Sequence, residues 1–116
     1  MDNLEYIKNQ VLIIMNFYNS RRYEDVILKG KPLIKKYPDQ VIFYNAVALS
    51  LSALGFHEEA LKILNKALNL NSNKIFVLNN IGLVNANKNN NKLAREYFEK
   101  ALKINENFID ALVNLS

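Results

Sequence analysis

The fold is decided by a stretch that occurs twice in tandem: residues 41–74, VIFYNAVALSLSALGFHEEALKILNKALNLNSNK, align without a gap on residues 75–108, IFVLNNIGLVNANKNNNKLAREYFEKALKINENF. Eight of the 34 aligned positions are identical, among them the pairs Ala60/Ala94 and Ala67/Ala101. A period of this length is typical of stacked helical hairpins, in which each repeat buries its apolar face only by packing on its neighbours.

The same frame extends in both directions along the chain. Residues 7–40 align with the later repeats at several apolar positions, and residues 109–116 repeat the beginning of 75–108. The length of 116 residues is that of one ordinary domain. We therefore expect a single array over residues 1–116, with repeats at 7–40, 41–74 and 75–108 and a partial fourth repeat at 109–116.

Within each repeat, apolar residues recur every three or four positions, which indicates two amphipathic helices per repeat. Gly55 marks the turn between them in the second repeat and Asn89 holds that place in the third, because both residue types accept a left-handed backbone. Asp39 and Asn73 are placed to cap the helices that follow them. The sequence predicts an all-α fold of about seven antiparallel helices, at residues 3–18, 23–36, 39–53, 57–69, 74–87, 91–103 and 107–116.

Small residues at fixed places in the period indicate how the hairpins pack. We expect Ala48 and Gly82, on the first helix of a repeat, to meet Ala60 and Ala94 on the second, so that the two backbones approach closely. We expect Ala67 and its counterpart one repeat later to do the same against the following repeat. A larger side chain at such a place would overpack the contact, at a cost of about 1–3 kcal/mol.

Together these residues resemble the tetratricopeptide repeat family, which implies an α-α superhelix. The pairs that fill the family's motif are Tyr44/Leu78, Val47/Ile81, Ala48/Gly82, Ala60/Ala94, Leu64/Phe98 and Ala67/Ala101. Residues 7–40 depart from the motif. Ile14 and Val26 stand where small residues are expected and Gly30 stands where a bulky one is expected, while Pro32 falls inside the second helix.

The resemblance also implies a concave groove lined by the first helix of each repeat. The residues expected to face it are Lys8, Val11, Met15 and Tyr18, then Ile42, Asn45, Leu49 and Ser52, then Phe76, Asn79, Leu83 and Ala86, and finally Asp110 and Val113. Many family members clamp a C-terminal carboxylate in this groove with basic residues. The corresponding places here hold Val11, Met15, Ala46, Asn79 and Leu83, so we expect no clamp of that kind.

Asparagines along this groove suggest how a partner would be held. A side-chain amide both donates and accepts hydrogen bonds, so a row of amides can bind the main chain of an extended peptide. The peptide-binding residues that we expect are Asn45, Leu49, Phe76, Asn79, Asn80, Leu83 and Asn114. Two alternatives stay open: the apolar members complete the packing between repeats, and a chain with nineteen asparagines places some on this face by chance.

The sequence does not indicate catalysis, a metal site or a cofactor. The chain has no cysteine, and its one histidine, His57, has no second ligand at metal-binding spacing. The adjacent acidic pairs at 24–25 and 58–59 are expected to be solvated, and no glycine-rich phosphate loop is present. We therefore expect a binding module for a protein or peptide, and not an enzyme.

Two other functions stay open. The array could be the N-terminal targeting region of a larger enzyme, such as a glycosyltransferase or sulfotransferase, because similar asparagine ladders precede catalytic domains of the O-linked N-acetylglucosamine transferase type. RNA binding is suggested by the net charge of +4. However, the basic residues concentrate in residues 7–40, mostly on the outer helix, and the groove has no charged track for phosphates, so we expect no specific nucleic acid. This basic end indicates either an anionic partner or a solvated helix face.

No segment resembles a signal peptide or approaches the roughly 20 apolar residues that cross a bilayer, so we expect cytoplasmic residence and no membrane partner. The sequence ends inside an expected helix whose Leu112, Val113 and Leu115 lack a covering partner. Because repeat stacks need polar terminal caps, we expect the array to continue in a longer protein and this uncapped end to self-associate.

Overall fold

Helices account for most of the computed structural model, which describes residues 3–70 and 72–116. Within these ranges no strand is assigned, and the helices are α1 (Asn3–Asn19), α2 (Tyr23–Lys36), α3 (Val41–Ala53), α4 (His57–Leu68), α5 (Lys74–Asn87), α6 (Asn91–Ile104) and α7 (Ile109–Leu115). The predicted all-α fold is confirmed, and each predicted helix boundary lies close to the observed one. α2 continues through Pro32 to its end.

Both predicted side-chain caps are wrong. Gln40 is the N-cap residue of α3, so Asp39 lies outside the capping position. Asn73 occupies the N-cap position of α5, but its side chain accepts no hydrogen bond from the helix. Its backbone is left-handed, with φ of 56°, whereas a capping side chain normally projects from an extended backbone. A cap does form at α6, where Oδ1 of Asn90 accepts a hydrogen bond from the backbone N–H of Leu93 at 3.5 Å.

The turn inside each repeat contains one residue in the left-handed conformation. Gly55 has φ of 92° and Asn89 has φ of 67°, as their residue types predict. Arg21, one period before Gly55, has φ of 59° although arginine has no preference for this region. The same turn geometry therefore recurs in all three repeats, and the first repeat adopts it without a favourable residue.

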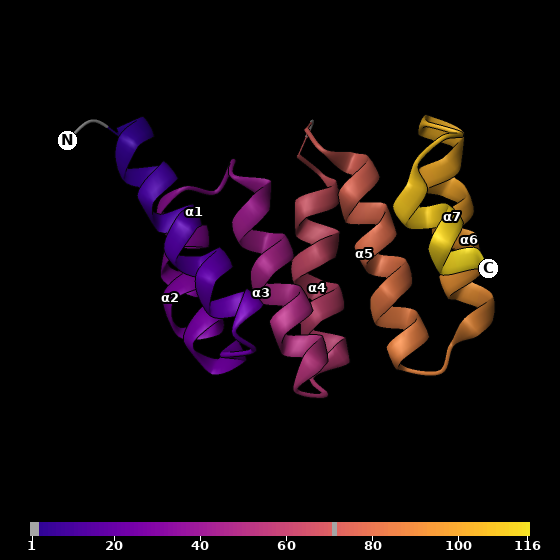
Figure 1. Ribbon diagram of the computed structural model, residues 1–116, viewed down its shortest axis with the longest axis horizontal. Coiled ribbons are helices and arrows are strands. Elements are labelled where there is room, and N and C mark those ends of the chain that lie inside the picture. Colours follow the sequence, from indigo (N-terminus) through magenta and orange to yellow (C-terminus); the bar gives the residue numbers. More distant parts are fainter. Residues whose placement is uncertain (1–2, 71) are drawn as a thin grey trace.

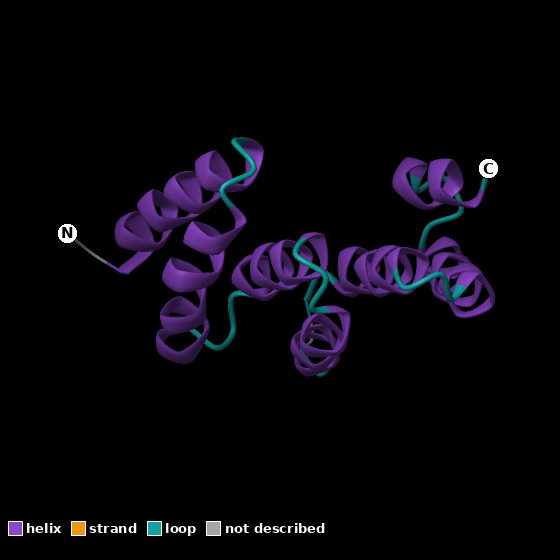
Figure 2. Ribbon diagram, turned by 90° about the horizontal axis from the view of Figure 1, so that it is seen from below, coloured by secondary structure: helices purple, strands orange, loops and turns teal. Residues whose placement is uncertain are grey.

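The helices alternate between two layers along the chain. The first helix of each repeat (α1, α3, α5 and α7) lies in one layer, and α2, α4 and α6 lie in the other (Figure 1). Seen along the helices, the first layer follows an arc in which α1 and α7 rise on the same side at the two ends (Figure 2). The stack measures 43 × 27 × 23 Å. The concave side of the arc is therefore formed by the first helix of each repeat.

The small residues face the interior, as the period predicts. At most 3% of the surface is exposed for each of Ala48, Ala60, Ala67, Ala94 and Ala101. These alanines belong to two clusters of buried side chains, one spanning the second repeat and α5 and the other joining the third repeat to α7. A further cluster around Ile14 and Phe43 joins the first repeat to the second. Each repeat thus completes its core with residues of the next one, which is the interdependence expected of a stack.

The contact at Gly82 differs from the expected one. The ring of Phe98, and not Ala94, is nearest to the position that a Cβ would take at Gly82. That Cβ would overlap Cε1 of the ring and lie 2.6 Å from Cδ1. Because glycine has no side chain, the ring of Phe98 can lie directly against the backbone of α5.

Polar contacts at the outer edge connect the second repeat to both neighbours. Nζ of Lys31 lies 2.6 Å from Oε1 of Glu59, and Lys88 pairs with Glu58. The hydrogen bond from Lys88, followed by its charge, lowers the pKa of the Glu58 carboxyl. Both glutamates stand at the start of α4, where a carboxylate is also favoured by the helix dipole. Because these pairs are exposed to solvent, they add little to stability compared with the buried clusters.

Candidate functional site

Two cavities are lined only by helices of the layer that forms the concave side. The first, which we call the apolar pocket, lies between α1 and α3, has a volume of about 170 Å³ and is lined by Met15, Tyr18, Ile42, Asn45, Ala46 and Leu49. The second, which we call the amide pocket, lies between α5 and α7, has a volume of about 310 Å³ and is lined by Asn79, Asn80, Leu83, Asp110, Val113 and Asn114.

The structure brings six of the seven predicted binding residues into these two pockets. Asn45 and Leu49 lie in the apolar pocket, and the amide pocket contains Asn79, Asn80, Leu83 and Asn114. The seventh, Phe76, lines neither pocket. Its ring packs edge-on against Phe108, with centroids 5.5 Å apart and an interplanar angle of 82°. Phe76 on α5 therefore packs against the N-cap residue of α7, while 46% of its surface stays exposed.

The apolar pocket carries no charged residue. Ile42 and Leu49 contribute aliphatic side chains, and Tyr18 contributes an aromatic ring. Burial, and to a lesser extent the neighbouring Tyr23, raises the pKa of the Tyr18 hydroxyl. The two tyrosine rings meet edge-on at 5.8 Å. The phenol is therefore neutral at physiological pH, and the pocket favours an apolar group.

Asn45 is the polar member of the apolar pocket, and the fold leaves part of its amide unused. Its Oδ1 is buried and has no hydrogen-bond donor among the described residues. A buried acceptor without a donor costs about 1–3 kcal/mol. The same condition holds for Oε1 of Gln10, Oγ of Ser50 and Oδ1 of Asn85 among the described residues, so it does not by itself mark a binding site.

In the amide pocket, part of the asparagine row is used to join repeats. Nδ2 of Asn114 on α7 donates a hydrogen bond of 3.0 Å to Oδ1 of Asn79 on α5. This bond leaves the amide N–H groups of Asn79 and the Oδ1 of Asn114 available, while no hydrogen bond within the described chain involves the side chain of Asn80. Asn79 and Asn80 are nevertheless largely buried, with 5% and 9% of their surfaces exposed. The pocket thus offers amide groups that are held in place by packing.

Ser52, which the resemblance placed in the groove, is instead turned into the contact between repeats. Its side chain is buried, and its Oγ lies 2.9 Å from Nδ1 of His57. The same Oγ accepts a hydrogen bond of 3.1 Å from Nδ2 of Asn87, which belongs to the next repeat. His57 therefore has a structural role at the beginning of α4, in agreement with the absence of a second metal ligand near it in the sequence.

The groove has no cationic side chain in either pocket. Asp110 is the one charged residue among the lining residues of the two pockets. A carboxylate ligand would meet this negative charge without an arginine or lysine to pair with. The lining residues of the two pockets therefore include no cation that could pair with a terminal carboxylate.

The described residues contain neither a candidate group of metal ligands nor a candidate membrane-spanning helix. In the ranges 3–70 and 72–116, no group of three or more His, Asp or Glu side chains is close enough to hold a metal ion. Among the same residues, no helix combines the length and the apolar character that crossing a bilayer requires.

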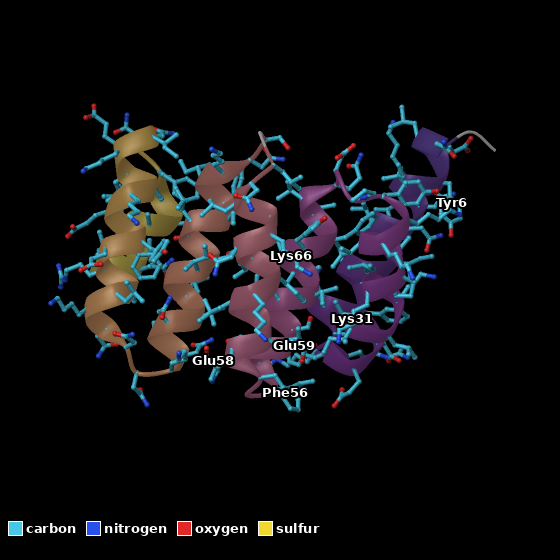
Figure 3. The ribbon with its side chains drawn as sticks, turned by 180° about the vertical axis from the view of Figure 1, so that it is seen from behind. Tyr6, Lys31, Phe56, Glu58, Glu59 and Lys66 are labelled. Carbon is cyan, nitrogen blue, oxygen red and sulfur yellow. The ribbon has the colours of Figure 1, made fainter. Side chains whose placement is uncertain are left out.

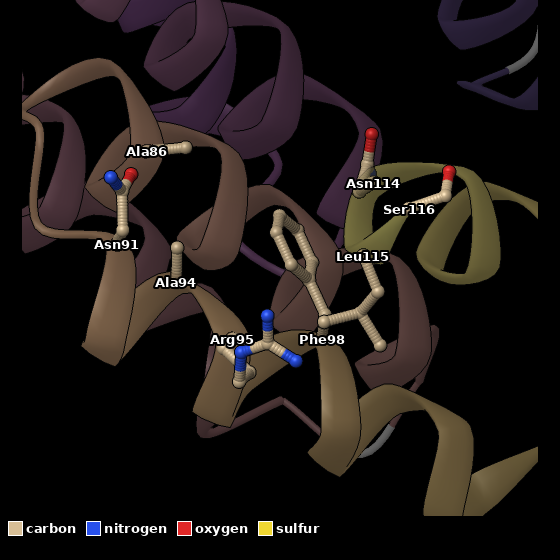
Figure 4. A pocket seen from close by; sticks show the side chains of 8 residues that line it. All are labelled: Ala86, Asn91, Ala94, Arg95, Phe98, Asn114, Leu115 and Ser116. Carbon is tan, nitrogen blue, oxygen red and sulfur yellow. The ribbon is translucent and has the colours of Figure 1, made fainter.

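A cavity of about 290 Å³ lies at the C-terminal end of the stack, against Ala94 and Phe98 of α6 (Figure 4). Arg95 and Leu115 stand at its rim, and Asn114 connects it to the neighbouring amide pocket. Leu115, expected to be uncovered, packs partly into the last buried cluster. Three other apolar side chains of the same helix stay exposed: Ile109, Leu112 and Val113, at 70%, 47% and 63% of their surfaces. Self-association through this end stays a prediction.

Comparison with known proteins supports the repeat architecture. The tetratricopeptide repeat family model matches residues 39–107, which include the second and third repeats. Curated relatives include the photosystem I assembly protein Ycf3 of Acaryochloris marina, 30% identical over 93 residues that make up 78% of this chain and 55% of that protein.

Ycf3 of Rippkaea orientalis is 30% identical over 95 residues, covering 79% of this chain and 54% of the relative. Ycf3 of Synechococcus elongatus is 33% identical over the same length and the same shares. The chain therefore spans a little over half the length of the curated relatives that it matches. The alternative of a targeting region in a larger transferase is not tested by these relatives and stays a prediction.

Proposed function

Because the chain belongs to the tetratricopeptide repeat family, we propose that it binds an extended segment of a partner polypeptide in its concave groove. The observation that carries the proposal is the presence, on one concave layer, of an uncharged apolar pocket followed by a pocket lined with amides. These two surfaces match the two components of an extended chain, namely its apolar side chains and its main-chain N–H and C=O groups.

The apolar pocket would take one aliphatic side chain of the partner. Its volume of about 170 Å³ suits a side chain of the size of leucine or isoleucine. Removing such a side chain from water stabilises a complex by about 1.5–3 kcal/mol. A donor of the partner could also satisfy the amide of Asn45 after a rotation of that side chain, which would remove the cost of its unpaired acceptor.

The amide pocket would bind the partner's main chain. Asn80 has both its donor and acceptor groups available, Asn79 offers donors and Asn114 offers an acceptor. Each hydrogen bond contributes about 0.5–1.5 kcal/mol net, so several together are needed for useful affinity. Since Asn79 and Asn114 already hold each other in position, little side-chain freedom would be lost on binding.

The dimensions of the stack set the length of the segment. An extended chain advances about 3.3 Å per residue, so roughly 13 residues would cover the 43 Å long axis. The absence of lysine and arginine from both pockets favours a segment without a cluster of acidic side chains. The relatives are named as photosystem I assembly proteins, and this supports a binding role for the present chain.

A peptide-display selection with random segments of about 13 residues tests the proposal, because no partner needs to be known in advance. The affinity of selected peptides is then measured by fluorescence anisotropy for four variants. Asn79→Ala combined with Asn80→Ala is expected to weaken binding by roughly tenfold or more, because at least two hydrogen bonds are lost. Leu49→Glu is expected to abolish binding by placing a charge in the apolar pocket.

The control variant is Asn65→Ala with Asn69→Ala, which changes the same residue type at exposed positions of α4 and of its C-cap. It is expected to leave the affinity unchanged. Asn80→Ala alone preserves the bond between Asn79 and Asn114, and thermal unfolding of each variant separates a loss of binding from a loss of folding. The proposal fails if the selected peptides bind the groove variants as tightly as the unaltered protein.

A further inference from the structure

A separate crevice lies on the opposite side of the stack from the groove, between α2 and α4. Its volume is about 300 Å³, and we call it the outer crevice. Its floor is apolar and consists of Ile34, Tyr44 and Ile63. Three lysines and one glutamate stand around this floor: Lys31, Lys62, Lys66 and Glu59. Figure 3 looks onto this face and shows Lys31, Glu59 and Lys66 together on it.

The charges around the outer crevice do not balance. Lys31 pairs with Glu59 at 2.6 Å, so these two neutralise each other. Lys66 forms no hydrogen bond or ion pair with any residue that the structure describes. Lys62 helps to lower the pKa of Glu58, but it acts through its charge alone and only after the larger effect of Lys88. Two ammonium groups are therefore left beside an apolar floor.

The next repeat shows that the fold does not require this charge. One period later the floor positions are Leu68, Leu78 and Tyr97, which remain apolar because they pack between repeats. The rim positions change: Lys31 is replaced by Asn65, and Lys62 is replaced by Glu96. Lys66 has a basic counterpart, Lys100, whose Nζ lies 4.4 Å from the centroid of the Tyr97 ring. Of these two sets of equivalent positions, the outer crevice alone carries an excess of positive charge.

We propose that the outer crevice binds an acidic segment of a partner protein, with one apolar side chain on the floor and carboxylates paired to Lys62 and Lys66. Charge complementarity supports an anionic partner, and the apolar floor supports a polypeptide, which carries apolar and acidic side chains side by side. A nucleic acid backbone fits less well, because it presents a continuous row of phosphates and no aliphatic side chain for the floor formed by Ile34 and Ile63.

This surface is independent of the concave groove. None of its residues lines the apolar pocket or the amide pocket. The two surfaces also select opposite partners, since the groove pockets contain Asp110 and no cation, whereas the outer crevice is basic. One protein could therefore hold an uncharged extended segment and an acidic segment at the same time.

The test uses a fluorescent synthetic peptide with a leucine flanked on each side by two glutamates, and a second peptide with glutamines in their place. The acidic peptide is expected to bind roughly tenfold more tightly at low salt, and the difference is expected to shrink at higher ionic strength. Lys62→Glu with Lys66→Glu is expected to lower the affinity for the acidic peptide by roughly tenfold or more.

The matched control is Lys92→Glu with Lys103→Glu, which changes the net charge equally at exposed positions of α6. It is expected to have a much smaller effect. An equal effect would overturn the proposal and indicate attraction to the whole protein. Tighter, Lys66-dependent binding of a single-stranded oligonucleotide would overturn it in favour of a nucleic acid, and a dimer that the Lys62 and Lys66 changes dissolve would overturn it in favour of a second copy. Asn79→Ala with Asn80→Ala is expected to leave the binding of the acidic peptide unchanged. The proposals for the groove and for the outer crevice are therefore tested independently.

Discussion

The first and third repeats fill the same contact between their two helices in opposite ways. In the first repeat, α1 contributes the large Ile14 and α2 contributes Gly30. A Cβ added at Gly30 would overlap the side chain of Val47 on α3 and would lie 3.6 Å from Cδ1 of Ile14, which is an ordinary contact. In the third repeat, α5 contributes Gly82 and α6 contributes the large Phe98. The second repeat is intermediate, with Ala48 and Leu64, both fully buried, at these positions.

This comparison shows that the repeats conserve the filled volume of the contact more closely than the residue at either position. Each pair combines one small and one large residue. Gly82 has no room for a side chain because of Phe98, its partner in the pair, whereas at Gly30 the obstacle is Val47 of the second repeat. Protein interiors are close-packed, so a loss of volume on one helix must be matched by a gain on its partner. The space beside Gly30, where residues 7–40 depart from the family motif, is therefore filled by Val47 of the second repeat together with Ile14.

The largest expected effect on stability comes from changing Gly82 of the third repeat to the alanine found in the second repeat, without also changing Phe98 to leucine. Gly82→Ala alone is expected to lower the free energy of unfolding by about 1–2 kcal/mol, because overlap with the Phe98 ring costs more than the helix gains from alanine. Adding Phe98→Leu is expected to recover at least half of that loss, as measured by urea denaturation. Strictly additive effects of the two changes would mean that the volumes are not coupled.

A smaller effect is expected in the turn of the first repeat. Arg21→Gly is expected to raise the free energy of unfolding by up to about 1 kcal/mol, because glycine relieves the left-handed backbone at φ of 59°. Gly55→Arg is the reverse change in the second repeat, where no atom outside the glycine and its neighbours lies within 4 Å of an added Cβ. It is expected to lower the melting temperature through backbone strain alone, and a rise would contradict this account of the turn.

The smallest effect concerns the exposed pair between the second and third repeats. Since Lys88 lowers the pKa of Glu58, the pair stabilises the fold above the ordinary carboxyl pKa of 4.5, and this contribution is lost as the pH falls through the lowered native pKa. Lys88→Met is expected to remove that part of the pH dependence of stability, as followed by denaturation at several pH values. Lys92→Met, at an exposed position of α6, serves as the control and is expected to leave the pH profile unchanged.

The positions of the helices were predictable because their determinants are local or periodic. Apolar spacing defined each helix, and Gly55 and Asn89 marked turns through their own backbone preferences. Arg21 could be assigned to the same turn geometry only by analogy with the later repeats, since its residue type disfavours it. The cap at Asn73 failed for a related reason: residue type favoured capping, but the backbone around it took a left-handed conformation.

The site was predictable to the level of the helix face and no further. The period and the family placed Asn45, Asn79 and Asn114 on the concave layer. The sequence could not show that Asn114 is hydrogen-bonded to Asn79. Nor could it show that the side chain of Ser52 lies against His57 and Asn87 in the contact between repeats. These outcomes depend on side chains from different repeats, and only their distance in space decides which pairs form.

The sequence by itself determined a stack of helical hairpins, because a period of apolar and small residues can be buried only by packing each repeat on the next. The tertiary structure decided which surfaces are open. It separated a groove whose pockets have no cationic side chain from a basic outer crevice, because the groove pockets lie between helices of the first layer whereas the crevice lies between α2 and α4. The tertiary structure also decided which large side chain fills the space beside Gly30 and beside Gly82, because that depends on atoms from different helices meeting in three dimensions.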